Sequence, residues 1–301
     1  MKILVTGKLG QVGHALQQTL SGTHDVVAMD REEMDLCQPD EIRSVIDAMR
    51  PELIINPAAY TAVDKAESEP ELAHAINAEA PKVIAEEAAK LGAGLIHFST
   101  DYVYEGNKAS PYIETDAVNP LSVYGKTKLA GEQAIQAVGL PHLILRTSWV
   151  YGAHGKNFLK TILRLSAERD QLKIVSDQWG APTSSEAIAN AVSQLLTHWK
   201  MSDQAQSGVY HFTNTGSTSW FGFAKAILKA YESQAAHHGL PALKICSEAI
   251  TPITTADYPT PAARPANSRL DNAKLLNTFG VALPEWESSM QAVMQQIQHF
   301  D

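Results

Sequence analysis

Tyr124 and Lys128 are the two residues of this chain whose types and spacing best suit acid–base chemistry. They lie in the segment NPLSVYGKTKLAGEQ (119–133), which reads as the start of a helix, and positions i and i+4 share one helix face. A phenol has a pKa of about 10, and a nearby ammonium favours the phenolate, so the phenol becomes a better proton donor near neutral pH. Most Tyr-x-x-x-Lys pairs are surface contacts, so the surrounding elements must decide whether this pair is catalytic.

A glycine pattern near the N-terminus predicts a site for a dinucleotide. Gly7, Gly10 and Gly13 form G-x-x-G-x-x-G between an apolar run and a helical segment that starts at Gln11. Such glycines permit a tight turn, and the helix N-terminus offers free N–H groups to a pyrophosphate. Asp30 ends the next apolar run, where a carboxylate can bind the adenosine ribose, whereas Arg31 would suit a 2′-phosphate. Both NAD and NADP therefore stay open, and a turn without ligand is the alternative.

The elements that would position these residues alternate regularly. Apolar runs at 2–7, 25–30, 52–59, 94–101 and 142–152 alternate with helical stretches at 11–21, 41–49, 70–91 and 122–138. This order predicts an α/β fold with a doubly wound parallel sheet of the Rossmann type. Ligands of such sheets meet the carboxyl ends of the strands. Thr100, at the end of the fourth run, is therefore expected to donate to the same carbonyl oxygen as Tyr124, with a strand-end cap as the alternative.

The pattern loosens after residue 152. Strand-like segments at 172–177 and 208–214 alternate with helical segments at 186–199 and 220–233, and a stretch rich in proline and threonine spans 251–271. We expect residues 1–152 to form a dinucleotide-binding core. Residues 153–301 are expected to form a smaller, mixed lobe that binds substrate and sends segments back to the core.

The composition of the 301 residues is that of a soluble globular protein, with 45% apolar and 19% charged residues. No run of about 18 apolar residues is present, and the N-terminus lacks the features of a signal peptide, so we expect no membrane segment and no leader. Cys37 and Cys246 lack metal-ligand spacing, which favours a reduced, cytoplasmic setting. The net charge of -9 argues against nucleic-acid binding.

Six motifs together resemble the extended short-chain dehydrogenase/reductase family: TGKLGQVG, NPAAYTAVDKAE, STDYVYEG, YGKTKLAGE, RTSWVYG and RPANSRLD. With DQWGAPT, they look like the subgroup that reduces dTDP-4-dehydro-L-rhamnose, and less like the epimerases and dehydratases of the family. The resemblance implies that NADPH or NADH delivers a hydride to C4 of a 4-keto-6-deoxy sugar carried by dTDP. It also implies that Tyr124 gives the proton, that Lys128 binds the nicotinamide ribose and lowers the tyrosine pKa, and that Thr100 assists at the oxygen.

The resemblance also implies binding residues. Together with the glycine loop, those expected at the cofactor are Gln11, Val12, Asp30, Arg31, Ala58, Ala59 and Tyr60. Those expected at the nucleotide-sugar are Thr61, Val63, Thr100, Asp101, Tyr102 and Trp149. Trp149 would supply a flat apolar wall, unless it is a core tryptophan. Arg264 and Arg269 are candidates for the substrate pyrophosphate, because arginine suits phosphate geometry, and surface charges are the alternative.

Two positions depart from the subgroup. Some bacterial members are described as magnesium-bridged homodimers, with glutamates in the first helix and after GAPT. Here the first position is Ala15, while Glu186 remains. The loss of one carboxylate removes a hard oxygen ligand, so the sequence decides neither magnesium nor a homodimer. Pro57 stands where a small residue is more usual, which removes a backbone N–H at a strand end.

Two other functions stay open at this point. One is a reductase of another nucleotide-4-keto-6-deoxy sugar. The other is a non-catalytic NADP-binding subunit similar to the regulatory subunit of methionine adenosyltransferase. The presence of Thr100, Tyr124 and Lys128 together favours an enzyme, and turnover of the keto sugar with NADPH would separate the three.

Overall fold

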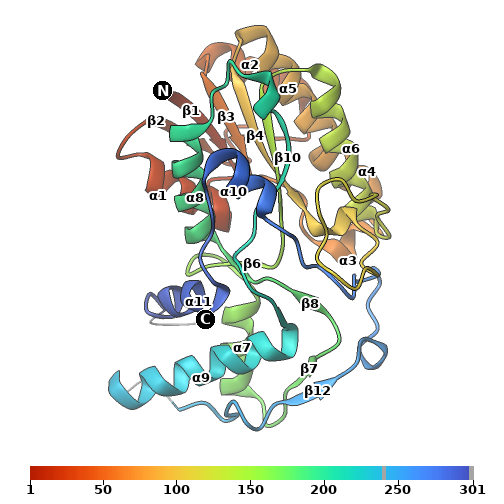
Figure 1. Ribbon diagram of the computed structural model, residues 1–301, viewed down its shortest axis with the longest axis vertical. Helices are drawn as coiled ribbons and strands as arrows, with labels where there is room; N and C mark the ends of the chain where they lie inside the picture. The colour runs from red at the N-terminus through yellow and green to blue at the C-terminus, as the bar shows by residue number, and fades with distance from the viewer. Residues whose placement is uncertain (239–241, 298–301) are drawn as a thin grey trace.

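The computed structural model, described for residues 1–238 and 242–297, is built around a six-stranded parallel sheet with strand order β10-β5-β4-β3-β1-β2 (Figure 1). All five neighbouring pairs are parallel. The strands are β1 Lys2–Thr6, β2 Asp25–Met29, β3 Leu53–Asn56, β4 Gly94–Thr100, β5 His142–Thr147 and β10 Gly208–His211. The predicted α/β fold with a doubly wound parallel sheet is confirmed.

Helices cover both faces of this sheet. Alternate strand residues point to opposite sides, and the apolar side chains on each side pack against helices. Ile3, Val5 and Ile55 pack into one apolar cluster, whereas Leu4 and Ile54 pack into another. The first cluster is covered by α1 Gln11–Leu20, α8 Ser185–His198 and α10 Ala273–Phe279. The second is covered by α2 Pro39–Met49, α5 Ala80–Leu91 and α6 Val123–Val138. Strand residues buried on both faces account for the continuous apolar runs in the sequence.

A separate part of the chain, called the second body below, lies beyond the carboxyl ends of the strands, at the foot of Figure 1, and has an apolar cluster of its own. Its main helices are α7 Phe158–Glu168, α9 Trp220–His238 and α11 Trp286–Met294. Short strand pairs accompany them: β6 Val150–Tyr151 with β9 Thr183–Ser184, β7 Lys173–Val175 with β12 Thr251–Ile253, and β8 Trp179–Gly180 with β11 Thr218–Ser219. The chain crosses repeatedly between the sheet and the second body, since β10 joins the sheet and the helices α8 and α10 pack on it.

The observed elements differ from the expected ones in a few places. The helix expected over 70–91 consists of α4 Pro70–His74, a π-helical turn η1 Ala75–Glu79, and α5. The run expected over 142–152 splits into β5 and β6. The loop at 251–271 contains β12 and a short 3₁₀ turn η4 Thr255–Asp257. The remaining short elements are α3 Val63–Ala66 and the 3₁₀ turns η2 Asp101–Val103 and η3 Gln204–Gln206. None of the described helices is long and apolar enough to cross a membrane.

Candidate active site

Helix α6 presents Tyr124 and Lys128 at the carboxyl end of the sheet. The helix starts at Val123 and is capped by Ser122, whose Oγ accepts the N–H of Gly125 at 3.1 Å. A Cβ on Gly125 would lie only 2.3 Å from the carbonyl oxygen of Tyr102. The absence of a side chain therefore lets the first turn of α6 lie directly against η2, next to the end of β4.

The Tyr124 side chain is half-buried beside β4 and η2. Its ring makes an edge contact with the ring of Tyr102, with centroids 5.5 Å apart. Burial raises the pKa of Tyr124 to about 12, the nearby Thr100 hydroxyl lowers it, and the Asp101 carboxylate raises it further. In the protein alone the phenol is thus held in its protonated form. Lys128 is not among the groups that shift the pKa of Tyr124 here, so its expected lowering of that pKa stays a prediction.

Thr100 and Asp101 stand directly behind the tyrosine. The Thr100 hydroxyl donates to Asp101 Oδ1 at 3.0 Å and accepts the Tyr102 N–H at 3.2 Å. Asp101 is 3% exposed, and burial raises the pKa of its carboxyl to about 6. Its Oδ2 atom is buried and has no hydrogen-bond partner among the described residues. The hydroxyl of Thr100 therefore serves as the strand-end cap of η2, and its catalytic role beside Tyr124 stays a prediction.

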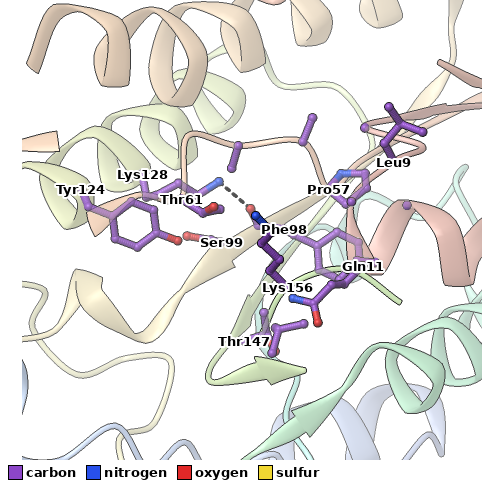
Figure 2. Close-up of a pocket in the computed structure, with 18 residues that line it drawn as sticks. Leu9, Gln11, Pro57, Thr61, Phe98, Ser99, Tyr124, Lys128, Thr147 and Lys156 are labelled. Carbon is purple, nitrogen blue, oxygen red and sulfur yellow. Dashed lines mark hydrogen bonds between the residues drawn. The ribbon is translucent and has the colours of Figure 1, made fainter. Parts of the chain in front are cut away.

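Lys128 lies one turn after Tyr124 and is 1% exposed. Its Nζ donates to the Phe98 carbonyl at 2.7 Å, drawn as a dashed line in Figure 2, and lies 3.2 Å from His97 Nε2. Burial lowers the pKa of Lys128 to about 8, while the negative charge of Glu132 raises it. The ammonium is therefore close to its titration point near neutral pH.

Tyr124 and Lys128 open onto a cavity of about 480 Å³ that starts at the glycine loop (Figure 2). A Cβ on Gly13 would lie 2.1 Å from the carbonyl oxygen of Gly7, so the first turn of α1 closes tightly on the loop. The loop therefore fits the close approach of a pyrophosphate to backbone N–H groups. The expected residues that line this cavity are Gly7, Gly10, Gln11, Val12, Gly13, Ala58, Ala59, Thr61, Tyr124 and Lys128.

A smaller cavity of about 160 Å³ adjoins the first, because Gly7, Ala58 and Ala59 line both. Asp30 and Arg31 line this second cavity, as expected for the adenosine end. Lys8 Nζ lies 3.3 Å from Asp30 Oδ2 and 2.6 Å from Glu33 Oε2. Hydrogen bonds from backbone N–H groups, above all that of Glu32, lower the pKa of Asp30. The ribose end thus presents both a carboxylate and an ammonium.

Trp149 has a strained backbone, with φ of 50°, which is rare for a large side chain. Its ring stacks on that of Trp220 with centroids 3.6 Å apart. Strained residues cluster at functional sites, so the backbone of Trp149 supports a binding role. Its stacking partner Trp220 packs against the apolar cluster of the second body.

The two arginines expected at a pyrophosphate lie in different surroundings. Arg264 Nη2 donates to Asp64 Oδ2 at 2.7 Å, while its Nη1 is buried without a partner among the described residues. Arg269 donates through Nε to Asn267 Oδ1 at 2.8 Å and lines a separate cavity of about 410 Å³. Asp64 belongs to α3, close to the loop at Thr61, so Arg264 is the better placed of the two arginines.

Tyr60 and Val63 line neither cofactor cavity. The Tyr60 hydroxyl donates to Glu69 at 2.5 Å, which raises its pKa to about 12. Val63 starts α3. Their predicted roles remain predictions.

Several cavity residues were not expected from the sequence. Lys156 reaches the cavity from the loop between β6 and α7, on the side opposite α6 (Figure 2). Lys156 follows His154 and Gly155 in the sequence, and none of the motifs used above includes it. Ser99 and Thr147 lie at the carboxyl ends of β4 and β5, so the expectation that every strand end of the sheet lines the site would have identified both. The unexpected residues of the larger cavity are Leu9, Pro57, Phe98, Ser99, Thr147, Val150, Gly155 and Lys156.

Glu186 is the carboxylate that remains at the two positions compared with the subgroup, the other being Ala15. Both carboxylate oxygens of Glu186 accept hydrogen bonds, from the Ala153 N–H at 3.2 Å and the Ser185 hydroxyl at 3.3 Å. The neighbouring rings of His14 and His154 are stacked 4.0 Å apart. No group of three His, Cys, Asp or Glu side chains that could hold a metal occurs in the described part of the chain.

Residues 1–299 match the family model described as RmlD substrate binding domain. A dTDP-4-dehydrorhamnose reductase from Burkholderia thailandensis is 45% identical over 290 residues, covering 95% of each chain. One from Escherichia coli is 42% identical over 301 residues, covering 99% of this chain and 98% of that protein. The structure of a dTDP-4-dehydrorhamnose reductase from Bacillus anthracis in complex with NADP has a TM-score of 0.88 at 34% identity, covering 98% and 99% of the two chains.

Proposed function

From the premise that this chain belongs to the family of the dTDP-4-dehydrorhamnose reductases, we propose that it reduces the C4 keto group of dTDP-4-dehydro-L-rhamnose to give dTDP-L-rhamnose. The observation that carries the proposal is that one helix directs Tyr124 and Lys128 into the cavity that starts at the glycine loop. A binding protein without chemistry would not need a half-buried phenol and a buried amine in the same cavity.

The residues of the cavity fit a nicotinamide dinucleotide, NADPH or NADH. Gly10, Gly13 and the N-terminus of α1 would hold its pyrophosphate, and Asp30 with Lys8 would hold the adenosine ribose. When bound, the reduced dinucleotide supplies the hydride. Because Lys8 already neutralises Asp30, a 2′-phosphate and a free 2′-hydroxyl both find a partner here, which favours acceptance of both cofactors.

Tyr124 donates its hydroxyl proton to the carbonyl oxygen as a C–H bond forms at C4. Burial keeps the phenol protonated at neutral pH. Thr100 would assist at the same oxygen after its hydroxyl proton, which goes to Asp101 Oδ1 in the protein alone, turns toward the sugar. Lys128 holds the nicotinamide ribose and places a positive charge near the phenolate that forms. A general acid positioned in this way contributes about 10²–10⁴-fold to the rate.

The substrate side is proposed from placement. We assign Trp149, which has a strained backbone and stacks on Trp220, and Arg264, which pairs with Asp64 of α3 and keeps one unpaired nitrogen among the described residues, to the substrate. Thr61, which lines the cavity, and Asp101 and Tyr102 behind Tyr124 complete the nucleotide-sugar contacts. We assign residues 1–152 mainly to the cofactor and residues 153–301 mainly to the substrate, with α8, β10 and α10 returning to the core. Two free cysteines in the described chain support a cytoplasmic setting.

The test is the loss of NADPH absorbance when enzymatically prepared dTDP-4-dehydro-L-rhamnose is mixed with the protein. We expect turnover by the wild type and none by Tyr124→Phe. Tyr231→Phe, a matched change in the apolar cluster of the second body, should keep the wild-type rate. Turnover only of another nucleotide-4-keto sugar would refute the proposed substrate. Tight NADPH binding without turnover of any such sugar would refute the reductase and favour a binding subunit.

A further inference from the structure

A buried chain of polar side chains runs under the sheet edge from the cofactor cavities to Lys128. The Ala58 N–H, at the wall shared by both cavities, donates to Thr6 Oγ1 at 3.2 Å, and Thr6 Oγ1 donates to Asn56 Oδ1 at 2.6 Å. Asn56 Nδ2 lies 3.1 Å from His97 Nδ1, and His97 Nε2 lies 3.2 Å from Lys128 Nζ. The four side chains are 0–1% exposed, so no water competes for these contacts.

Lys128 has only neutral partners in direct contact within the described residues. An ammonium has three N–H donors. One goes to the Phe98 carbonyl and one faces His97, which leaves the third for the cavity. A buried ammonium without a carboxylate in contact is costly, so the character of the His97 contact decides how stable the charged form is.

The hydrogen bonds of this chain have two self-consistent directions. In the arrangement seen here, Thr6 donates to Asn56 Oδ1, so Asn56 Nδ2 donates to His97 Nδ1. The ring proton then sits on Nε2 and points at Lys128, where only an uncharged amine can accept it. After a half turn of the Asn56 amide, Oδ1 faces His97, Nδ1 carries the proton, and Nε2 accepts from the Lys128 ammonium. Asn56 Nδ2 then donates to Thr6 Oγ1, whose own proton turns away from Asn56.

We propose that His97 is a positioning residue whose tautomer, linked to the orientation of the Asn56 amide, follows the charge of Lys128. In both arrangements the lysine keeps its two protein contacts and has one N–H left for the cavity. Lys128 therefore stays aimed at the bound dinucleotide whether it is charged or neutral. This role deepens the proposed function and depends on it for its use in catalysis, but the tautomer itself is a property of the protein alone.

The groups around the pair fit this role. Burial and the charge of Lys128 lower the pKa of His97 well below its ordinary value, so the ring stays neutral and can only change tautomer. On α6 the titratable neighbours are Tyr124 and Glu132. The Glu132 carboxylate is held by Arg146 of β5, and Asp101 of η2 acts on Tyr124. From η1, the uncharged Asn77 contacts Thr127 of α6.

The direct test is ¹⁵N NMR of histidine-labelled protein without cofactor or sugar. The His97 signals are assigned by their absence in His97→Gln. We expect the Nδ1–H tautomer at low pH and the Nε2–H tautomer at high pH, with a midpoint that follows the Lys128 titration near a pKa of about 8. In Lys128→Met the switch should disappear. A single tautomer across this range, or a switch that persists in Lys128→Met, would overturn the proposal.

A matched pair of variants tests the consequence for binding. A glutamine amide at position 97 reaches roughly the place of Nε2 and can turn either end to Lys128, whereas an asparagine amide reaches only the place of Nδ1. We expect His97→Asn to weaken NADPH binding about tenfold, the equivalent of one hydrogen bond, and His97→Gln to stay within about threefold of the wild type. Equal losses in both variants would reduce His97 to a packing role. Neither experiment uses the sugar, so a failure of turnover alone would refute the proposed function and leave this inference standing.

Discussion

Removal of Arg146 should destabilise the protein more than almost any other single substitution of a charged residue. Its guanidinium donates to both carboxylate oxygens of Glu132, at 2.9 and 2.6 Å, and to the Tyr104 hydroxyl at 2.7 Å. The Ser99 hydroxyl also donates to Glu132. The two charged side chains are 5% and 2% exposed, so solvent does not screen the pair.

The magnitude follows from burial. Arg146→Met leaves the Glu132 carboxylate buried without its cation, and breaking such a pair costs about 3–5 kcal/mol. For a urea m-value of about 3 kcal/mol/M, the unfolding midpoint should fall by about 1–2 M. Glu132→Met/Arg146→Met removes both charges and should be less destabilised than the single variant. Arg43→Met is the matched control, because its ion pairs are partly exposed and worth about 0–1 kcal/mol.

The pH dependence gives the loss a distinct sign. Without Arg146, Glu132 would bury a negative charge with no cation beside it, whereas in the unfolded chain the same charge is solvated. The free energy of unfolding of Arg146→Met should therefore fall as the pH rises and the unfolded chain ionises this carboxyl group. The loss relative to the wild type should be larger at about pH 8 than at about pH 5. Urea titrations at both values, followed by circular dichroism, measure this. A single variant that equals the double variant at both pH values would refute the reasoning.

Three further outcomes are expected. Tyr124→Phe should lower kcat by about 10²–10⁴-fold and leave the NADPH dissociation constant nearly unchanged in a fluorescence titration, since the phenol acts on the sugar oxygen; a matching loss of NADPH affinity would contradict this. Gly13→Ala should cost about 1–3 kcal/mol and weaken NADPH binding, because its Cβ would meet the Gly7 carbonyl oxygen, whereas Gly22→Ala meets nothing within 4 Å and should match the wild type in both thermal unfolding and binding. Asp101→Asn should raise the melting temperature at about pH 7.5 and leave it unchanged at about pH 4, because the raised folded-state pKa of Asp101 costs stability only above its unfolded value; the same gain at both pH values would show that ionisation is not the cause.

The architecture of the first half was predictable because buried parallel strands and their helices leave simple patterns. The apolar runs, the glycine loop and the position of Tyr124 at a helix start all depend on neighbours within a few residues. The predicted helix over 70–91 missed the π-helical turn at 75–79, where the buried side chain of Asn77 bonds to the backbone of Tyr60 and to Thr127. Such a turn depends on partners far away in sequence.

The site was predictable where a motif gives both residue type and spacing, as for Gly7–Gly13, Tyr124 and Lys128. It was not predictable where a long-range contact decides the role of a side chain. Lys8 belongs to the glycine motif, yet its pairing with Asp30 and Glu33 could not be inferred from spacing. The links from His97 to Asn56 and Lys128 span 41 and 31 residues, and Arg264 meets Asp64 across 200 residues.

The place of β10 at the edge of the sheet has a consequence for how the protein can be divided. This strand pairs with β5, although residues 148–207, with several elements of the second body, separate the two along the chain. A fragment cut at residue 152 would leave β5 as an open edge and would lack α8, which covers Leu16 and Leu20 on one face. Exposed strand edges and apolar faces promote aggregation. We therefore expect residues 1–152, the proposed cofactor half, not to fold as an autonomous unit. An exchange of the proposed substrate halves between relatives should keep α8 and β10 with the core.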